Sequence, residues 1–353
     1  MSGGARADGP VVIVFDAPGA AIPIVCCSLG GTFPSSINSE AAIAGYYSDV
    51  NALQHSFIRS PGGRFTTFDA PGTGTLAQQG TYAYNINAAG VVAGDFYDSN
   101  NVVHGFLRLT DGTFEVFDAP GAGTAAGQGT YACTVDCLTA DGRIAGDYID
   151  ANGVSHAFVR SANGAITTFD VPGAGTAINQ GTYPAGLNSS GTIEGAVVDI
   201  NGVYHGFVRT SDGVITTFDI PGATNTYPAN INAGGTVVGF YTDAGNGFHG
   251  FVRSESGVIT TFEAPNADVS AYVGTLAVCN NAADAIIGAY NDMNNLQHGY
   301  VRSPSGTFAS FDASAIGNPT SPSAINGSGV ITGSFTDINR GGLNRGFVRL
   351  NDE

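Results

Sequence analysis

A short unit is repeated along the whole chain, and this self-similarity limits the possible folds more than any other feature. One motif reads HSFIR, HGFLR, HAFVR, HGFVR or HGYVR, and its copies begin at His55, His104, His156, His205, His249 and His298. A seventh copy begins with Arg345 in place of histidine, and successive copies are 44 to 52 residues apart. A second motif, typified by the TFDAPG that ends at Gly72, also has seven versions and keeps step with the first.

Each unit contains four short β-rich runs separated by turn residues. In one unit these runs are TYAYNIN, VVAGDFYD, VVHGFLRL and TFEVFDAP, and no stretch of the chain has a convincing helical period. Four strands in each of seven units predict an all-β fold, a seven-bladed β-propeller of four-stranded antiparallel blades. We expect a single domain over residues 1–353, with residues 1–10 as a disordered tail.

The phase of the repeat favours a closed ring. The chain opens with a fourth strand, VVIVFDAP, and ends with a third strand, RGFVRL. If the N-terminal strand pairs with the C-terminal blade, that blade is completed and the two termini are held together. An open β-solenoid is the alternative, and it gives no reason for this phase.

Charge excludes several classes of partner. The chain has 29 acidic residues and 12 Lys plus Arg, all of them Arg, for a formal net charge of −17. We therefore expect no nucleic-acid partner, because binding to phosphates depends on basic side chains. We expect no membrane insertion, because no run is long and apolar enough, and no signal peptide in this segment, because it lacks a charged start followed by an apolar block. The five cysteines fit neither a paired disulfide framework nor a zinc site.

The repeat resembles a known family. The units INAAGVVAG, HGFLR and DGTFEVFD are similar to the HAF repeat of bacterial proteins, which is named for a tripeptide found here at His156, Ala157 and Phe158. The similarity covers nearly the whole chain, although Arg345 replaces the histidine of the last copy. It implies an extracellular or cell-surface location and does not imply an activity.

Each histidine follows an aspartate by six residues, as in DINGVYH, which raises the question of a catalytic or metal-binding pair. A two-residue turn at Asn201 and Gly202 pairs Val198 with His205, so that Asp199 and His205 point to opposite faces. The same count in the next hairpin pairs Phe207 with Phe218. We interpret the aspartate as bonded to its own turn and the histidine to a neighbouring strand, with a calcium site as the alternative.

Residues shared by all copies build the fold, so function is sought where copies differ. Three neighbouring connections are long and alike: APGTGTLAQQGTY, APGAGTAAGQGTY and VPGAGTAINQGTY. They lead into blades two to four and are expected around the mouth of the channel. Their candidate ligand-binding residues are Gln79, Gln128, Gln180, Tyr82, Tyr131 and Tyr183, together with Tyr227 of the next blade. Phe33 and Tyr272 are expected at the same place in other blades.

The same blades carry unusual acids in their second strands. Asp95 and Asp147 occupy a position held elsewhere by Tyr, Ala, Phe or Ser, and Glu194 stands two positions earlier. Alternation places all three on the same face of their strands. One interpretation is that they bond backbone or loop amides and hold the long loops. The other makes them candidate catalytic residues, because a carboxyl group with a raised pKa permits acid/base chemistry.

Two functions remain open from the sequence. The first is a secreted or cell-surface module, acting as a monomer, that binds a small-molecule or carbohydrate ligand at the channel mouth of blades two to four. The second is a lyase, hydrolase or cyclase with an acid/base site in or at the channel. We expect no cofactor and no metal, since motifs such as HExxH, GxSxG and a phosphate loop ending in Gly-Lys are missing.

Overall fold

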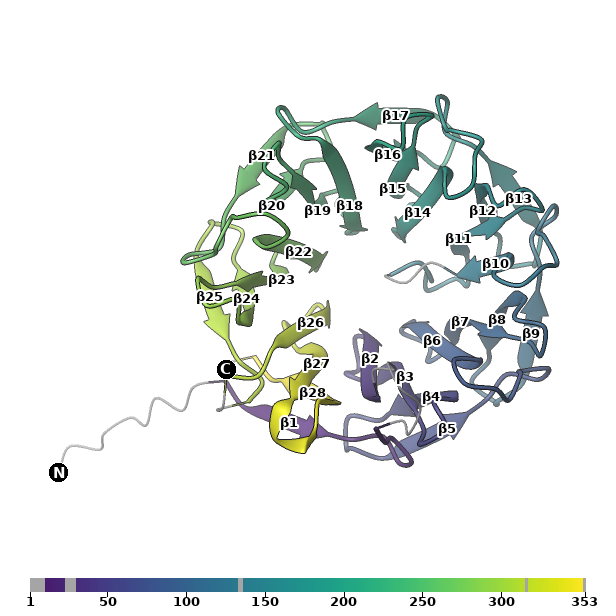
Figure 1. Cartoon of the computed structure of the whole chain (residues 1–353). Helices are drawn as coiled ribbons and strands as arrows, with labels where there is room; N and C mark the ends of the chain where they lie inside the picture. Colours follow the sequence, from purple (N-terminus) through teal and green to yellow (C-terminus); the bar gives the residue numbers. More distant parts are fainter. Residues whose placement is uncertain (1–9, 23–29, 133–135, 315–316, 352–353) are drawn as a thin grey trace.

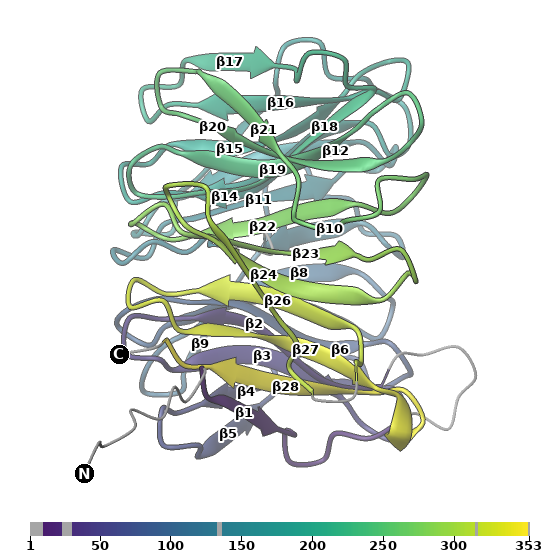
Figure 2. The ribbon, with the colours of Figure 1, turned by 90° about the vertical axis from the view of Figure 1, so that its left-hand side faces the viewer.

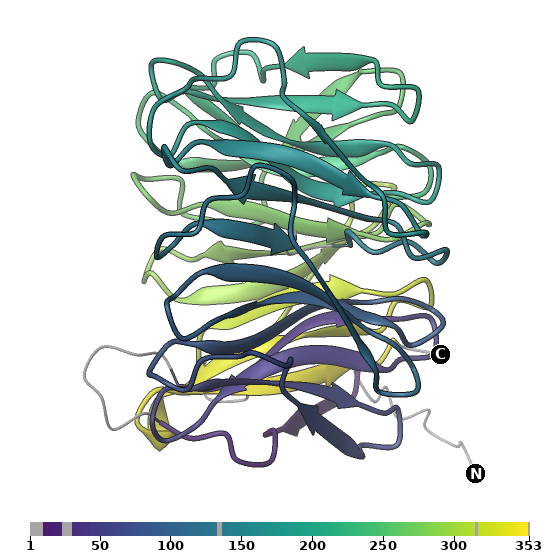
Figure 3. The ribbon, with the colours of Figure 1, turned by 90° about the vertical axis from the view of Figure 1, so that its right-hand side faces the viewer.

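The chain adopts an all-β, propeller-like fold. The computed structural model describes residues 10–22, 30–132, 136–314 and 317–351. Within these ranges all regular elements are β-strands except one short 3₁₀ helix, η1, over Ile338–Arg340. The predicted N-terminal tail, apart from residue 10, lies outside the described residues. Figure 1 shows the strands arranged radially about a central axis, and the side views in Figures 2 and 3 show them running between the two faces of the ring.

Strands that follow one another in sequence pair in antiparallel groups of four. The first two groups are β2 (Gly31–Ile37), β3 (Ile43–Ser48), β4 (Gln54–Arg59) and β5 (Phe65–Phe68), then β6 (Gly80–Ile86), β7 (Val92–Tyr97), β8 (Val103–Arg108) and β9 (Phe114–Phe117). The next two are β10 (Gly129–Ala132), β11 (Ile144–Ile149), β12 (Ser155–Arg160) and β13 (Ile166–Phe169), then β14 (Gly181–Leu187), β15 (Ile193–Val198), β16 (Tyr204–Arg209) and β17 (Ile215–Phe218).

The remaining strands continue the pattern. They are β18 (Asn225–Ile231), β19 (Val237–Thr242), β20 (Phe248–Arg253) and β21 (Ile259–Phe262), then β22 (Thr275–Asn280), β23 (Ile286–Asn291), β24 (Gln297–Arg302) and β25 (Phe308–Phe311), then β26 (Thr320–Ile325), β27 (Ile331–Asp337) and β28 (Leu343–Arg349). The N-terminal strand β1 (Val12–Phe15) pairs antiparallel with β28. Single parallel residue pairs, such as Gln54 with Gly80, connect some neighbouring groups, so that the hydrogen-bonded network forms one 20-stranded sheet and two four-stranded sheets.

The hairpin between the second and third strands of a group has a longer turn than the sequence suggested. Val198 pairs with Tyr204 and Val197 with His205, while the Asp199 amide donates to the Val203 carbonyl. The turn therefore holds three residues and ends at Gly202, whose φ is +79°. The predicted register, with Val198 opposite His205, is wrong by one residue. Because a shift of one residue reverses the face of every side chain, Asp199 and His205 lie on the same face.

Each repeated histidine bridges two carboxylates. His205 Nδ1 lies 2.8 Å from Asp219 of the following strand, and its Nε2 lies 3.7 Å from Asp199 Oδ2. Asp199 Oδ1 accepts hydrogen bonds from the amides of Asn201 and Val203 within its own turn. The expected bonds of the aspartate to its turn and of the histidine to a neighbouring strand are confirmed. The prediction of opposite faces is wrong.

The aromatic motifs pack between groups instead of pairing within one. Phe207 stands opposite Thr217, and Gly206 stands opposite Phe218, so the predicted pairing of the two phenylalanines is wrong. A Cβ atom on Gly206 would lie 2.5 Å from the Phe218 ring, which explains the glycine of the HGF motif. Phe207 is fully buried, and its ring meets Phe169 of the preceding group edge-on at a centroid distance of 6.3 Å.

The arginine of each repeat lies over the phenylalanine of the preceding group. The distance from the guanidinium carbon to the ring centroid is 4.6–5.1 Å in these contacts. The pairs are Arg59 with Phe15, Arg108 with Phe68, Arg160 with Phe117, Arg209 with Phe169, Arg253 with Phe218, Arg302 with Phe262, and Arg349 with Phe311. Such cation–π contacts stabilise by about 0.5–2 kcal/mol each, depending on how far the charge is removed from water.

Asparagine side chains join the groups a second time. Asn188 Oδ1 accepts from the amides of its own turn, and its Nδ2 donates to the carbonyl of Asn232 in the next group at 3.1 Å. The asparagine that follows the first strand of a group therefore both shapes a turn and connects two groups. The same contact occurs from Asn38 to Asn87, Asn87 to Thr139, Asn232 to Asn281, Asn281 to Asn326, and Asn326 to Asn38.

An arginine replaces the histidine where the chain ends meet. Arg345 on β28 contacts Asp16, the residue directly after β1. Its Nε and Nη2 donate to the two carboxylate oxygens of Asp16 at 2.9 and 3.1 Å. Its Nη1 also lies 3.5 Å from Asp337. A two-point contact of this kind is stronger and more directional than a single one. It holds the N-terminal strand beside the C-terminal one.

We expect Arg345→Ala to lower the free energy of unfolding by about 2 kcal/mol, because it removes two charge-assisted hydrogen bonds at a partly buried site. Arg340→Ala is the matched control, since Arg340 is half exposed and makes one contact with the same Asp16. That change should cost about 0.5 kcal/mol or less. Urea denaturation followed by fluorescence measures both, and equal losses would contradict the role given to Arg345.

Candidate functional site

The three glutamines of the long connections bond within their own loops. The Oε1 atoms of Gln79, Gln128 and Gln180 accept from backbone amides three residues earlier, at 2.9–3.0 Å. Gln79 also donates to Asn101 Oδ1, and Gln180 to the carbonyl of Ile200. The bonds of Gln79 and Gln180 tie their connections to the neighbouring Asp hairpins, and all three glutamines fix the shape of their own loops. A direct contact of the glutamines with a ligand stays a prediction.

Two of the expected tyrosines line a pocket, and two do not. Tyr131 and Tyr183 line a hollow of about 410 Å³ bounded by residues of β6, β7, β10, β11 and β14. Tyr82 packs at 5.0 Å against Tyr46, and Tyr227 stacks at 4.9 Å on Phe240, and neither lines that hollow. Tyr272 was placed wrongly, because Leu276 occupies the equivalent position opposite Ala289, and Tyr272 is 75% exposed in the preceding connection.

Tyr84 belongs to the same pocket and was missed by the sequence reasoning. It lies on β6 two residues after Tyr82, where the other repeats carry Ser, Ala, Val or Cys. A β-bulge interrupts the register at this point, and the rings of Tyr82 and Tyr84 stack with their centroids 6.2 Å apart, so the two side chains lie on the same side. The sequence did contain a sign of this residue, because a tyrosine at this position is an exception within the repeat.

Asp95 and Asp147 come from neighbouring groups and both line this pocket. Asp95 on β7 stands opposite Tyr82, and Asp147 on β11 stands opposite Tyr131. Asp95 is 2% exposed, and its Oδ1 atom has no hydrogen-bond partner among the described residues. Asp147 Oδ2 lies 2.9 Å from the Ser155 hydroxyl, which is also 2.9 Å from the carbonyl of Thr182.

The environment of the two carboxyl groups favours their neutral forms. Burial raises the pKa of Asp95 well above its usual range, and the charge of Asp147 raises it further, while a backbone hydrogen bond from Ala132 opposes the shift. Burial raises the pKa of Asp147 to about 7, against the opposing effect of the bond from Ser155. Near neutral pH the pair therefore carries less than its two formal charges.

Glu194 lies elsewhere. It is fully buried on β15, and neither carboxyl oxygen has a hydrogen-bond partner in the described part of the chain. A Cβ atom built on Gly186 would lie 2.7 Å from Glu194 Oε1 and 3.1 Å from the amide of Ile231 in the next group. At the matching position of β6, Asn85 Oδ1 accepts from the amide of Cys137 across the same kind of interface. Glu194 thus fills the space that other strands fill with a side chain at the position of Gly186.

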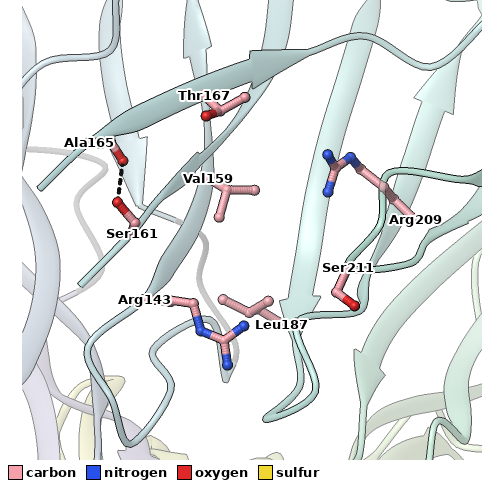
Figure 4. A pocket seen from close by; sticks show the side chains of 9 residues that line it. Arg143, Val159, Ser161, Ala165, Thr167, Leu187, Arg209 and Ser211 are labelled. Carbon is pink, nitrogen blue, oxygen red and sulfur yellow. Dashed lines mark hydrogen bonds between the residues drawn. The ribbon is translucent and has the colours of Figure 1, made fainter. Parts of the chain in front are cut away.

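A second pocket, of about 240 Å³, lies between the β10–β13 and β14–β17 groups (Figure 4). Here the repeat has Thr139 in place of the usual asparagine, and Arg143 at a position held elsewhere by Ala, Val or Thr. Arg143 Nη2 donates to the carbonyl of Ser189 at 2.8 Å, which replaces the missing asparagine contact between the groups. Arg209 faces the same hollow in Figure 4. Its guanidinium also lies over the ring of Phe169, at 4.6 Å from the ring centroid.

The described residues were also compared with what a metal site or a reactive thiol needs. They contain no cluster of three or more His, Cys, Asp or Glu side chains suited to a metal ion. Cys137 forms a disulfide, and Cys279 is a buried free thiol beside Asp136. Cys26, Cys27 and Cys133 lie outside the described ranges.

Replacing Glu194 tests the pH dependence that its burial implies. Burial raises the pKa of Glu194 from 4.5 to about 8, so between these values the folded state keeps a proton that the unfolded state has lost. The free energy of unfolding then falls as pH rises. The free energy of unfolding of Glu194→Gln, measured relative to that of the wild type, should rise by up to about 1.4 kcal/mol per pH unit across this window. Outside the window this difference should not change with pH.

Urea titrations at intervals from pH 4 to 9 measure this difference. Glu40→Gln serves as the control, because Glu40 is exposed in a turn. A difference between the Glu194 variant and the wild type that does not change with pH would rule out a buried, titrating carboxyl group.

Solved structures with a similar fold come from several kinds of protein. A streptogramin B lyase matches with a TM-score of 0.59 at 15% identity, covering 97% of this chain and 98% of that one. An inactive virginiamycin B lyase variant from Staphylococcus aureus, with quinupristin, matches at 0.60 and 14% over 97% and 100%. A lectin from Burkholderia pseudomallei matches at 0.52 and 10% over 90% and 98%. No family model and no curated protein sequence matches the chain. At these identities the likeness extends to the all-β, propeller-like fold alone.

Proposed function

We propose that the chain is one closed seven-bladed propeller that binds a small organic ligand in the pocket formed by Asp95, Asp147 and the tyrosines. Closure is supported by three contacts near the chain ends, one within the last group and two between the last and first groups. These are the pairing of β1 with β28, the hydrogen bond from Asn326 to the Asn38 carbonyl, and the contact of Arg59 with Phe15. The blades are the seven antiparallel groups of four strands, the last completed by β1.

One observation carries the binding function. Three tyrosine rings from three different strands line the 410 Å³ pocket together with two carboxyl groups. No other copy of the repeat has a carboxyl group at that position. Ligand pockets combine apolar or aromatic walls with a few convergent polar groups, and this one has that composition. Tyrosine faces suit stacking on a sugar ring or on an organic cation. The site belongs to the second to fourth blades at the mouth of the channel.

A second candidate function is acid/base catalysis in the same pocket. It is favoured by the pKa of Asp147, raised to about 7, next to Asp95, whose pKa is higher than usual. Near neutral pH a protonated Asp95 is a proton donor, and Asp147 is present in both forms. Such a pair can act as general acid and general base in a lyase, hydrolase or cyclase reaction. The binding function is preferred because it needs only the walls and polar groups described.

The setting of the protein is also a proposal. The His-Ala-Phe motif and its companions support membership of the HAF-repeat family, with an extracellular or cell-surface location. A monomeric state is a separate part of the proposal. Within the described residues no helix is long and apolar enough to cross a membrane. Light scattering coupled to size-exclusion chromatography tests the monomer.

We expect Tyr131→Ala and Asp147→Asn each to weaken ligand binding at least tenfold, because each removes a wall or a polar contact of the pocket. The measurement is a thermal-shift screen of monosaccharides and small amines, followed by calorimetry on each hit. Tyr227→Ala is the matched control, since Tyr227 occupies the same place in the repeat and stacks outside this pocket. A hit that loses as much affinity in Tyr227→Ala as in Tyr131→Ala would place the site elsewhere.

A further inference from the structure

The pocket has acidic and aromatic walls and contains no basic side chain to balance them. Its lining includes Asp95, Asp147 and the rings of Tyr84, Tyr131 and Tyr183, and none of its lining residues is Lys, Arg or His. The chain has no lysine, and its repeated arginines are engaged with phenylalanine rings between groups. Any charge that develops on Asp95 or Asp147 is therefore compensated only by a few hydrogen bonds. Buried carboxylates without a counterion are costly.

The carboxyl groups have unused capacity for a ligand. Asp95 Oδ1 is buried without a partner among the described residues, although the Asp95 side chain borders the hollow. Asp147 shares the Ser155 hydroxyl with the Thr182 carbonyl, and one hydroxyl proton cannot serve both acceptors at once. A positively charged group placed between the carboxyl groups would satisfy both.

On this basis, and resting on the proposed binding function, we propose that the pocket selects a small organic cation, a protonated amine or a quaternary ammonium, and that its binding expels a proton from the Asp95–Asp147 pair. The cation enters, one carboxylic acid loses its proton to solvent, and the net charge of the pocket is unchanged. The tyrosine rings contact the alkyl groups of the cation through their negative faces, as in other aromatic sites for ammonium ligands.

Asp147, whose pKa is raised to about 7, titrates near neutral pH, and the pKa of the neighbouring Asp95 is raised well above its usual range. The neighbouring tyrosines all have a pKa raised by burial, so they stay neutral in this range; they are Tyr46, Tyr82, Tyr84, Tyr97, Tyr131 and Tyr183. Burial and mutual repulsion keep a proton on the pair, and a cation reverses that preference. Affinity for a cation should therefore increase with pH, by at most tenfold per unit while one proton is released.

Choline and 3,3-dimethyl-1-butanol are suitable probes, because they have nearly the same shape and differ by the positive charge. Calorimetry of each with the whole protein at pH 5.5, 7.0 and 8.5 gives the affinity. We expect choline to bind at least tenfold more tightly at pH 8.5 than at pH 5.5, and more tightly than the alcohol at pH 8.5. Repeating the titration in two buffers of different ionisation enthalpy counts the released protons.

Variants locate the effect. Asp147→Asn should weaken choline binding and flatten its dependence on pH, whereas Asp141→Asn, at an exposed pair with Arg143 outside the pocket, should leave both unchanged. If Asp147→Asn does not fold, the two-buffer measurement on the wild type still decides. Equal binding of both probes at every pH would overturn the cation inference and leave the ligand-binding function standing. Absence of choline binding at millimolar concentration would overturn it as well, and the monosaccharide screen then decides the function independently.

Discussion

Contacts between neighbouring groups of strands hold this molecule together, because each four-stranded group buries its faces only against the next. The arginine of one group lies over the phenylalanine of the preceding one, and the aromatic residue within the histidine motif meets the same ring edge-on. Asparagine side chains add a hydrogen bond near the other end of the interface. Arginine and phenylalanine recur in every copy because each interface uses them, whereas the repeated histidine is structural within its own group, where it lies between two carboxylates.

Much of the architecture could be predicted from periodicity, while the register could not. The sequence showed where strands begin and end, but the Asn-Gly dipeptide suits both a two-residue turn and a three-residue turn that ends in a left-handed glycine. The structure has the latter, and the difference of one residue places Asp199 beside His205. Tyr272 was misplaced for a related reason, since its connection differs in length from the others and gives no fixed point for counting.

The candidate site shows what exceptions within a repeat can and cannot reveal. Asp95 and Asp147 were found as departures from the pattern, and they come together because equivalent positions in neighbouring groups face the same interface region. Glu194 departs from the pattern in the same way, yet its carboxyl group fills the space beside Gly186. Glu194 can be told apart from a site residue only because a neighbouring strand has a glycine, Gly186, where other copies have a larger side chain. The two residues belong to different strands, so the sequence does not show that they are neighbours.

Arg345 replaces the repeated histidine at the place where the two ends of the chain meet, between β1 and β28. Six copies of the motif use an imidazole between two carboxylates, and hydrogen bonding to Asp69 raises the pKa of His55, so its charge depends on acidity. The seventh copy, at the seam between β1 and β28, uses a guanidinium that stays charged at any ordinary pH. No continuous chain joins β1 to β28, so side-chain and backbone contacts alone hold these two strands together. The guanidinium of Arg345 supplies a charge there that does not change over the pH range in which an imidazole titrates.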